Sequence, residues 1–124
     1  KFLVNFVLFF MEQLPQLQGL LNIPKSCVIL SHRNPDGDAM GSSLALKHYL
    51  DKKEHKATVV VPNEYPDFLH WLPGSETTYR FDWQNSQSQR AIKASEIIFL
   101  LDSNFVARSR AAITAVNADV EAVS

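Results

Sequence analysis

The chain has 124 residues, with twelve Lys and Arg against thirteen Asp and Glu, giving a formal net charge of −1. This length fits one domain with a single core, and 46% hydrophobic with 20% charged residues is ordinary for a folded protein, which argues against disorder. A near-neutral chain lacks the basic face needed to wrap long duplex nucleic acid, so that class of partner is excluded. The single cysteine, Cys27, cannot form an internal disulfide and predicts a reducing, cytoplasmic compartment. Its apolar neighbours predict a buried thiol.

The chain opens with an apolar run from Phe2 to Phe10 that is broken only by Asn5. A bilayer-spanning helix needs about 20 such residues, so no membrane span is expected. The residues after the run offer no small-residue cleavage site of the kind that follows a signal peptide. We therefore interpret residues 1–10 as an apolar N-terminal extension, upstream of a natural start at Met11.

Apolar spacing along the rest of the chain predicts alternating strands and helices. Leucines at helical spacing indicate a helix over residues 12–22, and helical patterns return over 39–52, 67–71, 86–95 and from 107 onward. Buried strands are predicted at 27–30, which is an unbroken apolar run, at 57–61, which contains three consecutive valines, and at 97–101. This alternation predicts an α/β fold, a parallel sheet with flanking helices and right-handed crossovers.

Potential ligand residues cluster directly after the first predicted strand. His32, Asp36 and Asp38 lie within seven residues, and ligands of open α/β sheets bind at the carboxyl ends of the strands. Two carboxylates this close repel one another unless a cation lies between them. Oxygen ligands with one imidazole suit manganese or magnesium, and Gly37 permits a sharp bend between the aspartates.

A second group of polar residues follows the third predicted strand. Asp102 follows that strand at the edge of the sheet where Asp38 follows the first, and Asn104 and Arg108 extend the same loop toward a phosphate oxygen. We expect Ser42, together with Gly41, to open the next helix with free amides that can hold phosphate. Carboxylates and a histidine at strand ends would suit a two-metal hydrolase.

Each of these features also has a structural interpretation. The pair of aspartates around Gly37 is common in turns, and Asp38 could cap the following helix. His32 and Asp102, taken singly, are more often structural residues than ligands. Trp71 is expected to pack in the core near Leu72.

Two stretches resemble the motifs of the DHH phosphoesterases. The first motif covers His32-Arg33-Asn34-Pro35-Asp36-Gly37-Asp38-Ala39-Met40-Gly41-Ser42, and the second covers Leu101-Asp102-Ser103-Asn104 with Arg108 four positions beyond. Between them, residues 62–69 and 71–74 resemble the branch of bifunctional oligoribonucleases, also called phosphoadenosine-phosphate phosphatases. The resemblance covers about residues 11–110.

The resemblance implies a site with two Mn²⁺ ions bound by His32, Asp36, Asp38 and Asp102. His32 and Asp36 would serve one ion, Asp38 the other, and Asp102 would bridge both. Phosphate contacts are implied for Asn34, Ser42, Asn104 and Arg108. The implied reaction is hydrolysis of short oligoribonucleotides or 3′-phosphorylated adenosine phosphates, with a homodimer conceivable for the full-length form.

The sequence departs from the family because the Asp-His-His triplet and the later substrate-binding domain are absent. We therefore interpret residues 11–124 as the N-terminal portion of a DHH domain that is incomplete at the C-terminus, and we expect the chain to be inactive alone, with no catalytic residue assigned. Within the family, a cyclic-dinucleotide phosphodiesterase or a RecJ-like exonuclease stays open. Outside it, a non-catalytic metal- or nucleotide-binding module and a plain α/β interaction domain stay open.

Overall fold

A computed structural model describes residues 2–5, 18–31, 35–101 and 121–123, the first and last of these as backbone only. Within them lies one parallel sheet of six strands in the order β4-β3-β2-β5-β1-β6. The strands are β1 (Phe2–Asn5), β2 (Ser26–Leu30), β3 (Lys56–Val61), β4 (Tyr79–Arg80), β5 (Ile97–Leu100) and β6 (Glu121–Val123). The predicted α/β class is therefore confirmed.

The three strands predicted from sequence are β2, β3 and β5, and they lie side by side at the centre of the sheet. The strands β1, β4 and β6 were not predicted. The strand β1 falls inside the segment interpreted as an N-terminal extension, and it pairs with β5 and β6. Whether residues 1–10 lie upstream of the natural start stays a prediction.

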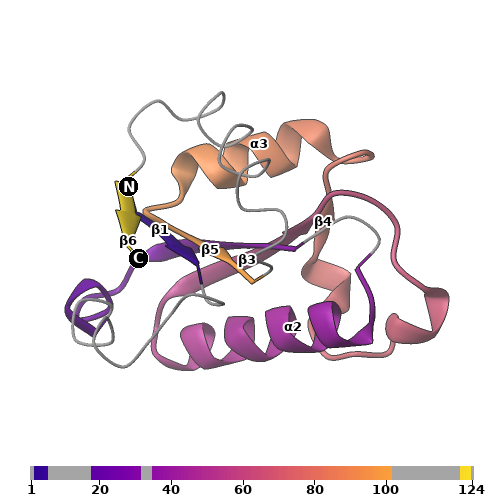
Figure 1. The fold of residues 1–124 in the computed structure, drawn as a ribbon, viewed down its shortest axis with the longest axis horizontal. Coiled ribbons are helices and arrows are strands. Elements are labelled where there is room, and N and C mark those ends of the chain that lie inside the picture. The colour runs from indigo at the N-terminus through magenta and orange to yellow at the C-terminus, as the bar shows by residue number, and fades with distance from the viewer. Residues whose placement is uncertain (1, 6–17, 32–34, 102–120, 124) are drawn as a thin grey trace.

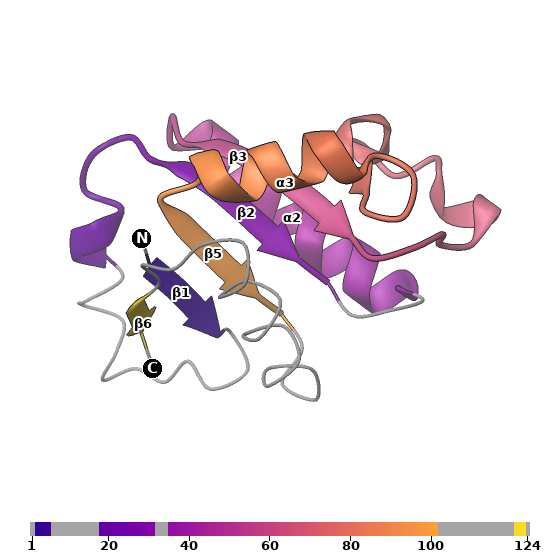
Figure 2. The same cartoon turned by 90° about the horizontal axis from the view of Figure 1, so that it is seen from above.

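Two helices cover opposite faces of the sheet. Figure 1 shows α2 (Gly37–Lys52) on one side of the strands and α3 (Asn85–Ala94) on the other. Figure 2, seen from above, shows α3 lying across the central strands with α2 behind them. Two short 3₁₀ helices, η3 (Asp67–Leu69) and η4 (Ser75–Thr77), lie between β3 and β4. Residues 18–20 are helical, whereas the helix predicted from residue 107 falls outside the described residues.

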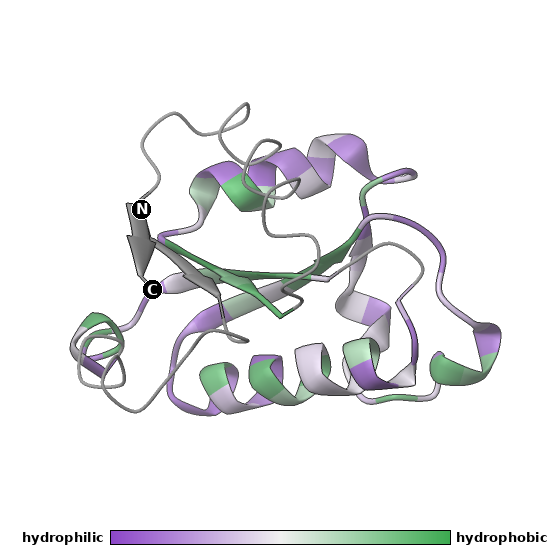
Figure 3. Ribbon diagram, viewed as in Figure 1, coloured by the Kyte–Doolittle hydropathy of each residue, from purple (hydrophilic) through white to green (hydrophobic). Residues whose placement is uncertain are grey.

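The core has two halves because successive side chains of a strand point to opposite faces. Cys27, Ile29 and Phe99 pack toward α2, whereas Val28 and Ile98 pack in the cluster on the α3 side. All five are at most 2% exposed. Figure 3 shows the central strands as the apolar layer between helices with polar outer faces. This two-sided burial explains the unbroken apolar runs of the sequence.

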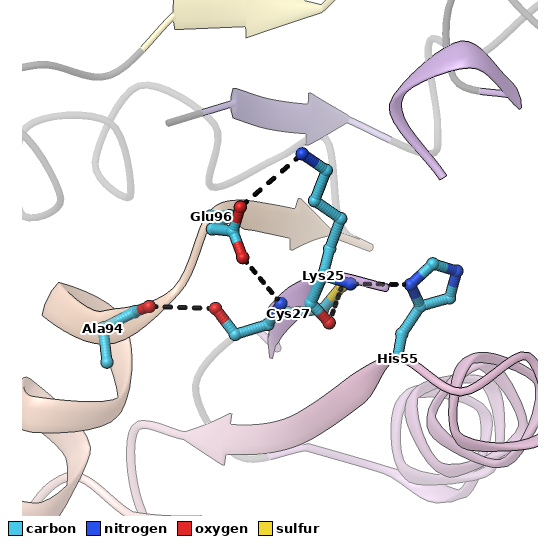
Figure 4. Close-up of polar contacts among 6 residues, drawn as sticks. Lys25, Cys27, His55, Ala94 and Glu96 are labelled. Carbon is cyan, nitrogen blue, oxygen red and sulfur yellow. Dashed lines mark hydrogen bonds and ion pairs between the residues drawn. The ribbon is translucent and has the colours of Figure 1, made fainter. Parts of the chain in front are cut away.

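The amino end of β2 is held by polar contacts to its neighbours (Figure 4). The backbone N–H of Lys25 donates to Nδ1 of His55 at 3.0 Å, and Oγ of Ser26 donates to the carbonyl of Ala94 at 2.9 Å. Oε1 of Glu96 accepts from the backbone N–H of Ser26 at 3.3 Å, and Nζ of Lys25 lies 3.5 Å from Oε2 of the same carboxylate. These contacts fix the starts of β2, β3 and β5 relative to one another.

No helix in the described part of the chain is long and apolar enough to cross a bilayer. This agrees with the expectation that the protein has no membrane span.

Candidate functional site

The strand order reverses direction beside β2. From β2 the chain passes through α2 to β3 on one side, and it later returns through α3 to β5 on the other side. Leu30, the last residue of β2, is in register with Val60 of β3 and with Leu100 of β5. A crevice between the carboxyl ends of strands at such a reversal is where ligands bind to open α/β sheets.

Several predicted site residues lie beyond these strand ends. His32 follows Leu30 by two positions, as Asp102 follows Leu100, so the paired register starts both loops from the same edge. The side chains of His32 and Asp102 fall outside the described residues. So do those of Asn34, Asn104 and Arg108.

Asp36 begins α2 as its N-cap. Its backbone is extended, at φ −93° and ψ −172°, and its Oδ1 accepts the backbone N–H of Ala39 at 2.9 Å. The carbonyl of Asp36 accepts the N–H of Met40 at 2.9 Å. The capping role considered for Asp38 therefore belongs to Asp36. The carboxylates of Asp36 and Asp38 are both exposed, and neither forms an ion pair within the described residues.

The expectation that Gly41 and Ser42 open the helix is wrong. The Asp36 cap starts α2 at Gly37, so Gly41 and Ser42 lie in its second turn, where amides bond within the helix. Within the described part, the first-turn amides without a partner are those of Gly37 and Asp38. An anion at this helix end would meet those two donors. Ser42 has an exposed side chain, and its predicted phosphate contact stays a prediction.

A groove of about 520 Å³ runs beside the start of α2. Three carboxylates, those of Asp36, Glu64 and Asp67, line this acidic groove, and no basic side chain lines it among the residues that the structure describes. Its other lining residues are Pro35, Asn63, Tyr65 and Pro66. Such a groove needs a cation before it can hold a phosphate.

The sequence analysis did not identify Asn63, Glu64 or Asp67 as site residues. A signal was present, because these residues follow the carboxyl end of β3 as the motif residues follow β2 and β5. The shared edge of a parallel sheet would have grouped all three loops.

The segment after β3 is held against α2 by its own side chains. Leu69 is 6% exposed, and its Cδ2 lies 3.9 Å from where a Cβ on Gly37 would be. The rings of Tyr65 and His70 stack with centroids 4.4 Å apart. Oγ of Ser75 donates to the carbonyl of His70 at 2.7 Å. One wall of the groove is thus fixed to the helix that begins at Asp36.

The expectation that Trp71 packs in the core is wrong. Trp71 is 75% exposed, whereas its neighbour Leu72 is the residue that packs against the core. Phe68, on the same segment, is 71% exposed.

No three His, Cys, Asp or Glu side chains among the described residues gather closely enough to hold a metal ion. The four predicted ligands include two of the residues that are not described, so the ligand set stays a prediction. The described pair fits a hard cation, because Asp36 and Asp38 offer exposed oxygens beyond the end of β2 and neither forms an ion pair with another described residue.

The sequence and the fold of the chain were compared with those of known proteins. The model of the DHH family, N-terminal domain, matches residues 26–123. The chain belongs to the DHH family. A similar solved structure, the crystal structure of an exopolyphosphatase-related protein from Bacteroides fragilis, superposes with a TM-score of 0.79 and is 29% identical. The match covers 94% of this chain and 35% of that one, so the DHH chain described here spans about a third of that relative's length. No curated protein matches the chain.

Proposed function

We propose that this DHH domain belongs to a manganese-dependent phosphoesterase acting on short oligoribonucleotides or 3′-phosphorylated adenosine phosphates. One observation carries the proposal: the register of Leu30 with Leu100 starts both motif-bearing loops from the topological switch point of the sheet, beside the acidic groove. The family match supports the general class of hydrolase.

The chain's own residues would hold the metal and orient the phosphate. His32, Asp36, Asp38 and Asp102 would be the ligands. The ions, when bound, polarise the phosphoryl group and make hydroxide available near neutral pH. The bond from Ala39 to Oδ1 of Asp36 fixes that carboxylate at the helix start, and the amides of Gly37 and Asp38 are donors for a phosphate oxygen.

The acidic groove supports a small substrate. A long polyanion binds to a basic surface, and neither the net charge of −1 nor the carboxylates of the groove provide one. The bound metal would therefore be what attracts the phosphate of a small substrate. Inorganic polyphosphate is a second candidate, because the similar solved structure is that of an exopolyphosphatase-related protein. The two candidates share phosphate recognition and differ in whether the substrate carries a base.

Calorimetric titration of Mn²⁺ into the chain tests the metal site. Asp36→Asn keeps an oxygen that can cap α2 but removes the charge, so we expect weaker Mn²⁺ binding with unchanged folding. Asp38→Asn should behave in the same way. Asp36→Ala should also destabilise the fold by about 0.5–2 kcal/mol, because the cap is lost.

Glu54→Gln is the matched control, since Glu54 is an exposed carboxylate at the other end of α2. It should leave Mn²⁺ binding unchanged. Saturable binding should be accompanied by Mn²⁺-dependent hydrolysis of a diadenylate by a form of the protein that includes the Asp-His-His triplet. Normal hydrolysis by Asp36→Asn and Asp38→Asn in that form would refute the proposal.

A further inference from the structure

Two large aromatic side chains are exposed on the chain segment that follows the lining residues of the acidic groove. Phe68 follows Asp67, which lines the groove, and Trp71 lies three residues further along. They are 71% and 75% exposed. In Figure 1 the segment that carries them, around η3, lies beyond the end of α2 that begins at Gly37. The segment that carries the rings therefore lies near the start of α2, where the groove is found.

Their exposure is built into a rigid segment. Leu69 and Tyr65 are buried on either side of Phe68, and the next ring, His70, stacks on Tyr65. Phe68 lies in η3 and Trp71 in the turn that follows it, and both are directed outward while Leu69 and Leu72 pack inward. The chain thus fixes the backbone of this segment and leaves two rings for another molecule.

Among the described residues, the groove supplies no other free ring for stacking. Tyr65 is the aromatic residue in its lining, and that ring is 5% exposed and already stacked on His70. For a nucleotide held by its phosphate at the crevice, Phe68 and Trp71 are the exposed rings on the segment that follows the groove. Every nucleobase has a flat π-face that can stack on such rings.

We propose that Trp71, assisted by Phe68, stacks the base of the substrate and so makes the site prefer nucleotides over phosphate chains that lack a base. This inference rests on the proposed function for the position of the phosphate. It adds Trp71 as a specificity-determining residue that the motifs do not contain.

A second exposed tryptophan provides the comparison. Trp83 is 79% exposed, but the guanidinium of Arg80 lies 4.4 Å from its ring centroid, over one face of the ring. The chain has two tryptophans in all. In Trp83→Phe, tryptophan emission therefore reports on Trp71 alone.

The test compares two ligands in the presence of Mn²⁺. The probes are a phosphorothioate diadenylate that resists hydrolysis and inorganic tripolyphosphate, each titrated by calorimetry. Trp71→Ala should weaken diadenylate binding about five- to 150-fold, the range expected for loss of one stacked base, and leave tripolyphosphate binding unchanged. Trp71→Phe should restore most of the lost affinity, and Phe68→Ala should show a smaller loss. Trp83→Ala should match the unsubstituted chain. In Trp83→Phe, diadenylate should quench the emission of Trp71.

The outcomes separate the inference from the proposed function. Unchanged diadenylate binding in Trp71→Ala, or equal losses for both ligands, overturns base stacking, and Mn²⁺-dependent tripolyphosphate binding would then leave the phosphate site standing. Quenching of Trp71 by diadenylate without Mn²⁺ supports stacking but counts against the metal site. Binding of neither ligand overturns both.

Discussion

At the scale of single residues, Cys27 is a structural thiol. It is 2% exposed within β2, and burial, aided by the charge of Glu96, raises its pKa from 9.0 to about 12. A thiolate is the reactive form of cysteine, so the native thiol should be inert. This agrees with the predicted buried thiol and gives Cys27 no part in the reaction.

The raised pKa of Cys27 predicts a loss of stability in alkali. Because the folded pKa lies above the unfolded value of about 8.5, the folded chain holds the proton more tightly between roughly pH 9 and pH 12. Stability from the neutral thiol is complete below pH 8 and falls as pH rises through this window. The difference in unfolding free energy between the unsubstituted chain and Cys27→Ala, measured by urea denaturation, should shrink from pH 7 to pH 10.

A thiol reagent provides the companion measurement. The native chain at pH 8 should react much more slowly than the urea-unfolded chain. A difference in unfolding free energy that stays constant with pH, together with fast native labelling, would contradict the burial of Cys27.

At the scale of elements, the segment between β3 and β4 determines the shape of the groove. Nε2 of His48 in α2 donates to the carbonyl of Pro73 at 2.9 Å, and Gly74 follows with a left-handed φ of 90°. A Cβ on Gly74 would lie 3.3 Å from that same Nε2 and 3.4 Å from Cδ2 of Leu44. The segment is thus fixed to α2 behind the groove as well as at Leu69.

Gly74→Ala should therefore destabilise the chain by about 1–2 kcal/mol, the cost of a left-handed conformation for a residue with a Cβ. Urea denaturation would measure the change. Gly19→Ala is the matched control, because a Cβ there would meet nothing within 4 Å, and it should be neutral or slightly stabilising. Equal stability of the two variants would show that the turn at Gly74 is not constrained.

The sequence was most informative about elements that satisfy both local pattern and burial. The strands β2, β3 and β5 were predicted because each contains a run of at least three consecutive apolar residues that is buried in the structure. The strand β4 has two residues of intermediate burial, so it has no apolar run to recognise. The start of α2 was placed two residues late because the cap bond of Asp36, rather than apolar spacing, determines it.

The candidate site shows the same limit. The first motif lies in one stretch of sequence, so it could be recognised before the fold was known. Glu64 and Asp67 join Asp36 only because β3 lies beside β2, which is a property of the tertiary structure. Trp71 was assigned to the core from its size and neighbours, but the turn that buries Leu69 and Leu72 directs it outward.

At the scale of the whole molecule, the sheet has a rigid centre and a weaker described edge. The strand β2 pairs on both sides, with β3 and β5, and lies between α2 and α3. The strand β4 is two residues long, lies at the edge of the sheet and pairs on one side, with β3. Local opening requires less free energy where fewer buried contacts must break. The loops of the candidate site leave from the carboxyl ends of the most strongly held strands.

Hydrogen exchange should therefore separate the two regions. Amides of Val28, Ile29 and Ile98 should exchange only through global unfolding, so urea should accelerate them with the slope of the global transition. The amide of Phe81, which donates to the carbonyl of Val61 at 2.8 Å just beyond β4, should exchange on the order of a hundredfold faster and depend weakly on urea. Equal protection of Phe81 and Ile29 would mean that the edge and the centre unfold as one unit. Opening of β4 alone would leave the segment between β3 and β4 held to α2 at Leu69 and His48, so the exposed rings would keep their place while the edge strand opens.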